Sequence, residues 1–193
     1  MHADATALSS PLFFEFMKPN YLVISVLGAD HPGMLNLLSE TILAAECNIE
    51  ESRMTVLGSE FAAIILVSGK WNGVAKLEDT LPALAQRHDL QLILRRTQSR
   101  DHVGDKLPYA VDVAALNQKG IVRNLAGFFS GRGINIEDMS TSGYAAAHTG
   151  TPMFAVHMHL SIPADTHIAA LRDEFLDFAD QLNFDAVIEP LKN

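Results

Sequence analysis

The sequence carries one pattern twice, and this repeat constrains the fold more than any other feature. Gly33 lies 15 residues before Asn48, and Gly120 lies the same 15 residues before Asn135. The two copies are offset by 87 residues, and their apolar positions keep step. Leu35, Leu38 and Ile42 of the first copy match Val122, Leu125 and Phe129 of the second. Such a chain is expected to fold as two copies of one small unit.

The first copy predicts the order strand, helix, strand, strand, helix, strand. Its β-rich runs are 21–27, 49–56, 61–68 and 90–96, and the middle two form a hairpin. Asp30 is expected to cap the first helix, and apolar residues at helical spacing from Val74 to Leu84 mark the second. Pro82 is expected to break or kink this second helix near Leu81, because proline lacks the N–H that a helix interior requires.

The second copy repeats the order. Its expected strands are 109–115, 136–142, 153–162 and 184–189, and its expected helices are 117–132 and 165–182. Its hairpin holds six extra residues within 144–152, since Phe61 matches Phe154 at an offset of 93. The polar stretch 98–106 has the composition of a linker, so we expect domains at 20–97 and 106–193. The order βαββαβ predicts an α+β chain of two tandem ferredoxin-like units, each an antiparallel sheet with both helices on one face.

One strand of the first copy is apolar on both sides. The side expected to face the helices holds Phe61, Ala63, Ile65 and Val67, yet the opposite side holds Ala62, Ile64 and Leu66. Because an open sheet face is normally polar, we expect the other repeat or a second chain to cover this one, which favours a homo-oligomer such as a dimer. The matching outward positions of the second copy are Ala155, His157 and His159, a mixed set.

Composition excludes several classes of protein. No stretch approaches the roughly 20 apolar residues of a membrane span, and residues 1–19 lack the basic start of a signal peptide. Cys47 is the single cysteine and cannot form an internal disulfide, so we expect a reducing, cytoplasmic location. A net charge of −9 argues against direct binding to nucleic-acid phosphates.

A split βαβ unit with Asp/Asn-x-x-Gly after its first strand and Asn-Ile at the start of its second resembles the ACT domain, a small module that binds amino acids and regulates attached or partner proteins. The resemblance covers nearly the whole chain. Two such units in tandem, with nothing else, resemble the glycine cleavage system transcriptional repressor family. This resemblance implies a regulator of glycine cleavage genes that acts through a DNA-binding activator, without touching DNA itself.

The two turns are also plausible ligand sites on physical grounds. A helix N-terminus offers amide N–H groups and a positive dipole end to a carboxylate, and glycine lets the backbone approach a ligand. An asparagine amide can donate to a carboxylate and accept from an ammonium group. Together with the resemblance, these arguments give six candidate ligand-binding residues, which are Asn117, Gly120 and Asn135 in the second unit and Asp30, Gly33 and Asn48 in the first.

The second unit is the stronger candidate, because Asp30 would repel a carboxylate and Asn117 would not. A purely structural role stays open for all six residues, since Asp and Asn often cap helices and many ACT-like units serve only as dimerisation surfaces.

Other residues do not point to catalysis. The chain has no nucleophile elbow and neither phosphate-binding glycine motif, so we expect no enzyme activity and no cofactor. His157 and His159 share one side of a strand, as two metal ligands could, but no third ligand is nearby in the sequence, so we expect no metal. Cys47 aligns with Ile134 and is expected to be buried. The preferred hypothesis is an amino-acid-binding regulator; a regulatory subunit of a metabolic enzyme, or an oligomerisation scaffold, stays open.

Overall fold

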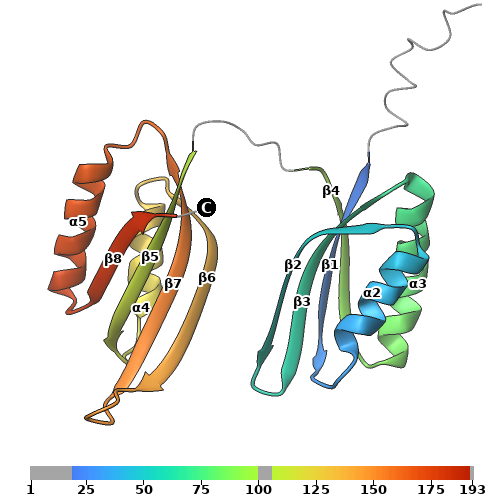
Figure 1. Cartoon of the computed structure of the whole chain (residues 1–193), viewed down its shortest axis with the longest axis horizontal. Helices are drawn as coiled ribbons and strands as arrows, with labels where there is room; N and C mark the ends of the chain where they lie inside the picture. The colour runs from blue at the N-terminus through green and yellow to red at the C-terminus, as the bar shows by residue number, and fades with distance from the viewer. Residues whose placement is uncertain (1–18, 100–105, 192–193) are drawn as a thin grey trace, which may run out of the picture. The chain divides into compact units, whose positions relative to one another are not determined.

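The computed structural model describes residues 19–99 and 106–191, which divide into two compact units on either side of residues 101 and 102 (Figure 1). The linker expected at 98–106 lies mostly outside the described residues, and so does Arg100, one of its basic residues. No helix in the described parts of the chain has both the length and the apolar character needed to cross a bilayer.

The first unit has the predicted element order. Its elements are β1 (Asn20–Ala29), α2 (Met34–Ala44), β2 (Asn48–Leu57), β3 (Glu60–Gly69), α3 (Trp71–Arg87) and β4 (Gln91–Thr97). The strands form one antiparallel sheet in the order β2-β3-β1-β4. Helices α2 and α3 lie side by side against one face of this sheet (Figure 1).

The second unit repeats this architecture. Its elements are β5 (Lys106–Leu116), α4 (Ile121–Ser130), β6 (Asn135–Ala145), β7 (Pro152–Pro163), α5 (Ile168–Gln181) and β8 (Asp185–Pro190), with the sheet order β6-β7-β5-β8. The expected insertion is present as the loop between β6 and β7. The prediction of two tandem βαββαβ units, α+β with antiparallel sheets, is therefore confirmed.

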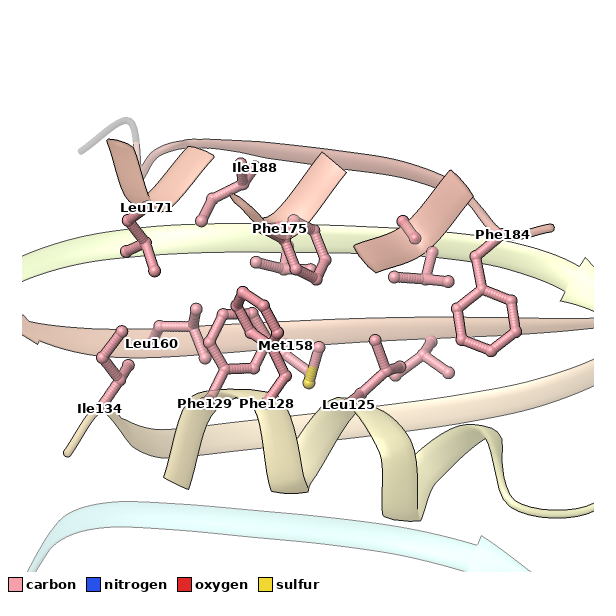
Figure 2. Close-up of a cluster of buried hydrophobic side chains, with 14 of the residues drawn as sticks. Leu125, Phe128, Phe129, Ile134, Met158, Leu160, Leu171, Phe175, Phe184 and Ile188 are labelled. Atoms are coloured by element: carbon pink, nitrogen blue, oxygen red, sulfur yellow. The ribbon is translucent and has the colours of Figure 1, made fainter. Parts of the chain in front are cut away.

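Each core lies between the helices and one face of the sheet, because strand residues alternate between buried and exposed positions. In β7, Val156, Met158, Leu160 and Ile162 are buried, while the residues between them are half-exposed. Figure 2 shows this core in the second unit, where Leu125, Phe128 and Phe129 of α4 point toward Phe175 of α5. The ring centroids of Phe129 and Phe175 are 5.2 Å apart, within the range of favourable aromatic contact.

The helix starts differ from the sequence prediction. Neither Asp30 nor Asn117 begins or caps a helix; α2 begins at Met34 after Gly33, and α4 begins at Ile121 after Gly120. The reason is the backbone of the two glycines, which have φ of 98° and 93° and turn the chain sharply just before each helix. The prediction of an Asp30 cap was therefore wrong.

The break expected near Leu81 at Pro82 is absent, and a kink there stays a prediction. Helix α3 runs unbroken from Trp71 to Arg87. Pro82 lies on its exposed side, so the carbonyl of Glu78, which loses its helical partner, is not trapped in the core.

Two expectations about burial have different outcomes. Cys47 is buried as predicted, at 7% exposure, and burial raises the pKa of its thiol. The apolar outer side of β3 is uncovered within the first unit, where Ile64 is 51% exposed. Coverage of this face by another unit or chain stays a prediction.

Candidate functional site

The turn before α2 leaves three amides without a helical acceptor. The first helical hydrogen bond is donated by the amide of Leu37 to the carbonyl of Gly33 at 2.9 Å, so the three preceding amides, of Met34, Leu35 and Asn36, have no acceptor inside the helix. No side chain of the described residues caps this end. The turn can therefore accept an anionic group from outside.

The turn before α4 has the same construction. The amide of Asn124 donates to the carbonyl of Gly120 at 2.9 Å, and α4 likewise has no side-chain cap within the part of the chain that the structure describes. In both units the turn is fixed to the neighbouring hairpin. The amide of Asp30 donates to the carbonyl of Ser59 at 2.9 Å, and the amide of Asn117 donates to the carbonyl of Pro152 at 3.0 Å. Two candidate residues thus position the turn through their backbones.

A hollow of about 260 Å³ lies at the turn of the first unit. His31, Pro32, Gly33, Met34, Asn36, Leu37, Glu40 and His88 line it. Added β-carbons at Gly33 and Gly120 would meet nothing within 4 Å, so the space above both glycines is open. The structure thus places Gly33 beside a hollow large enough to admit a small molecule.

The two turns differ in charge. Asp30 lies at the first turn and Glu40, inside α2, lines its hollow, whereas Lys119 and Arg123 lie at the second turn and Asn117 replaces Asp30. Because cations attract a carboxylate and anions repel it, the expectation that the second turn is the better carboxylate site stays a prediction. Lys119 and Arg123 were not among the predicted site residues. At the repeat offset of 87 residues, Lys119 and Arg123 match the uncharged Pro32 and Asn36 of the first unit. This difference in charge between the two copies was the signal that could have identified them.

The asparagines at the start of the second strands each pair with a glutamate. Asn48 Nδ2 donates to Glu50 Oε1 at 3.1 Å, and Asn135 Nδ2 donates to Glu137 Oε1 at 2.7 Å. Each glutamate is the extra residue of a β-bulge, since the register of β2 against β3 shifts between Ile49 and Glu51 and that of β6 against β7 shifts at the equivalent place.

The environment of Glu50 favours its ionised form. The Ser68 hydroxyl donates to Glu50 Oε1, and together with the Asn48 amide it lowers the pKa of Glu50 below its usual range. Sequence reasoning missed Glu50 and Glu137 as site residues, although the repeated Asn-Ile-Glu contained the signal. The bulge itself is a property of strand register and left no mark on the sequence.

The structure does not bring the turn and the asparagine of one unit together. Ala29, next to the turn, pairs with Glu60 at the start of β3, whereas Asn48 pairs with Ser68 at its end. Helix α2, with 11 residues and a rise of about 1.5 Å per residue, separates the two by roughly 16 Å. Each unit therefore carries two candidate half-sites, a turn at one end and an asparagine-glutamate pair at the other.

Comparison with known proteins identifies the relatives of this chain. Residues 20–94 match the ACT domain family. The glycine cleavage system transcriptional repressors of Escherichia coli (strain K12) and Shigella flexneri are each 29% identical over 164 residues, which cover 85% of this chain and 86% of theirs.

Two crystal structures share the whole architecture. One is described as a candidate glycine cleavage system transcriptional repressor and is 28% identical, with a TM-score of 0.69, covering 91% of this chain and 99% of its own. The other is an unknown protein from Galdieria sulphuraria, 24% identical with a TM-score of 0.73, covering 91% of this chain and all of its own. The second shares the fold only.

Proposed function

We propose that this chain binds a small amino acid and regulates a partner protein without catalysing a reaction. The premise is that the chain is an ACT-domain protein related to the glycine cleavage system transcriptional repressor. The observation that carries the proposal is the duplicated pair of half-sites. Both units keep the uncapped glycine turn, and both keep the asparagine-glutamate pair on a bulge.

The two kinds of half-site suit the two ends of an amino acid. The uncapped amides at Gly120, with Lys119 and Arg123 nearby, favour a carboxylate. The Asn135 side-chain amide uses its nitrogen to donate to Glu137, so its own oxygen can accept from an ammonium group. The Glu137 carboxylate adds negative charge that also favours an ammonium group. A small zwitterion such as glycine matches this polarity.

One ligand can contact both half-sites only where two units meet, because the half-sites lie at opposite ends of a unit. We propose that a second copy of the chain supplies the asparagine-glutamate pair to the turn of the first. Ligand binding would then favour one association state over another, which is the condition for a small molecule to regulate anything.

The proposed partner is a DNA-binding activator of glycine cleavage genes. The name of the repressors similar to this chain supports a role in transcription, and the net charge of −9 supports contact through a protein rather than through DNA phosphates.

Isothermal titration of the full chain with glycine, serine and alanine tests ligand binding. Glu137→Gln removes one charge-assisted contact, worth about 1.5–3 kcal/mol, and should weaken binding about 10- to 100-fold. Glu189→Gln removes the same charge from an exposed position of β8 and should leave binding unchanged. Absence of heat and of any melting-temperature shift with millimolar amino acid would refute the ligand site.

A second experiment separates transcriptional regulation from enzyme regulation. The full chain is used to capture partners from cells with and without added glycine. Ligand-dependent recovery of a DNA-binding activator supports the proposal, whereas ligand-dependent recovery of a metabolic enzyme would replace it with the regulatory-subunit hypothesis.

A further inference from the structure

The sheet face of the second unit that is turned away from its helices carries a hydrogen-bonded chain of three side chains. His157 Nδ1 on β7 lies 2.6 Å from Asp112 Oδ1 on β5, and His157 Nε2 lies 3.0 Å from His159 Nε2. Asp112 is directly opposite His157 in the β5–β7 register. The side chains of His157 and Asp112 are 42% and 59% exposed, so the cluster is accessible.

The fold does not require these residues. At the offsets of 87 and 93 that relate the two repeats, Ser25, Ile64 and Leu66 of the first unit occupy the positions of Asp112, His157 and His159. Ser25 is opposite Ile64 in the β1–β3 register, as Asp112 is opposite His157. The first unit therefore forms the same backbone without the aspartate and the two histidines. These three side chains distinguish the second unit from the first.

The hydrogen bonds fix which nitrogen of His157 can bind a ligand. A carboxylate only accepts hydrogen bonds, so Nδ1 of His157 must carry the proton that is shared with Asp112. In the neutral ring this leaves the lone pair on Nε2, which is directed toward His159. A carboxylate behind a histidine that presents its other nitrogen is the usual arrangement around metal-bound histidines.

The separation of the two Nε2 atoms fits a shared cation. A Zn²⁺ ion about 2.0–2.1 Å from each nitrogen places the nitrogens about 2.9 Å apart at a 90° angle and about 3.4 Å apart at the tetrahedral angle. The observed 3.0 Å lies within this range. A cation can thus replace the proton between the two rings with little movement of exposed side chains.

We propose that His157 and His159 bind a divalent transition-metal ion of the Zn²⁺ type, with Asp112 as the positioning residue for His157. A second carboxylate beside the site also favours a cation, since Asp185 lines the adjacent hollow of about 370 Å³.

Within residues 19–99 and 106–191, no group of three or more His, Cys, Asp or Glu side chains is placed to hold a metal. The protein therefore supplies two ligands, and water from the open hollow supplies the others. The proposal departs from the sequence-based expectation of no metal, because neither the convergence of the two Nε2 atoms nor the contribution of Asp112 could be read from spacing.

Titration of the full chain with ZnCl₂, in competition with a chromophoric chelator, tests the site. His157→Gln and His159→Gln should each remove the tightest site, weakening Zn²⁺ binding at least tenfold. His148→Gln should leave it unchanged, because His148 is exposed in the β6–β7 loop of the same unit. Asp112→Asn should weaken binding about 10- to 100-fold, as loss of a carboxylate behind a metal-bound histidine does.

Nitrogen NMR of the wild-type imidazoles gives a readout that does not depend on any variant. One equivalent of Zn²⁺ should shift the Nε2 resonances of His157 and His159 together and leave that of His148 in place. The proposal is overturned if the wild-type chain binds no Zn²⁺, if it binds with the same affinity as the two histidine variants, or if other histidines shift first.

Discussion

The two glycines of α4 predict opposite effects of one substitution. Gly120 precedes the helix with a φ of 93°, whereas Gly127 lies inside it, and an added β-carbon meets nothing within 4 Å at either position. Gly120→Ala therefore isolates the backbone conformation, and Gly127→Ala isolates helix propensity. Neither result depends on a steric clash.

The magnitudes follow from the backbone. A positive φ costs an L-residue about 1–2 kcal/mol, and part of this is offset because alanine restricts the unfolded chain more than glycine does. Gly120→Ala should therefore destabilise the second unit by about 1 kcal/mol. Gly127→Ala should stabilise it by about 0.5–1 kcal/mol, the usual gain inside an exposed helix.

Thermal melting of the full chain, followed by far-UV circular dichroism, measures both effects. A change of 1 kcal/mol shifts the Tm of a unit of this size by about 4–8 °C, so the two variants should move the second unit's transition in opposite directions. The fluorescence of Trp71, the single tryptophan, reports the first unit and should not change. Equal shifts of the same sign in both variants would refute the assignment of Gly120 to a left-handed turn.

Three further predictions concern the first unit. Gly73→Ala should destabilise it by about 1–3 kcal/mol in a tryptophan-detected urea titration, because the new β-carbon would lie 2.6 Å from the carbonyl oxygen of Ala45; unchanged stability would contradict this close approach. Pro82→Ala should stabilise the first unit by about 1–3 kcal/mol in the same titration, because residue 82 regains the N–H that a helix interior uses. A loss of stability would show that the proline fits the helix. The pKa of Glu50 is lowered, so its contribution to stability is complete above about pH 4.3 and is lost as the pH falls through the lowered value; Ser68→Ala should raise that pKa in a carbon NMR titration, and no change would disprove the contact.

The topology was predictable because it depends on periodicity. Apolar residues at helical spacing and β-rich runs placed all eight strands and four helices of the described residues in the right order, and the repeat at 87 residues supplied an internal check. The helix starts were not predicted, because the left-handed glycine turns leave Asp30 and Asn117 outside the helices. The preference of Asp and Asn for helix caps does not show which residue has the positive φ that sets where the helix begins.

The candidate site was predictable only in part. Gly33, Gly120, Asn48 and Asn135 stood out by repetition, but their separation to opposite ends of a unit follows from strand register. The partners Glu50 and Glu137 depend on the bulges, and the Asp112–His157 contact joins residues 45 apart in sequence. Such contacts are set by pairing between strands, which no local sequence window contains.

Amide NMR of the full chain during titration with glycine tests the central claim most directly. The account predicts that the backbone amides of Ile121, Val122 and Arg123 and the side-chain amide of Asn135 shift together and saturate at the same glycine concentration. If the helix-start amides stay in place while glycine binds elsewhere, or if no resonance moves at millimolar glycine, the turns are structural and the proposed amino-acid site is wrong.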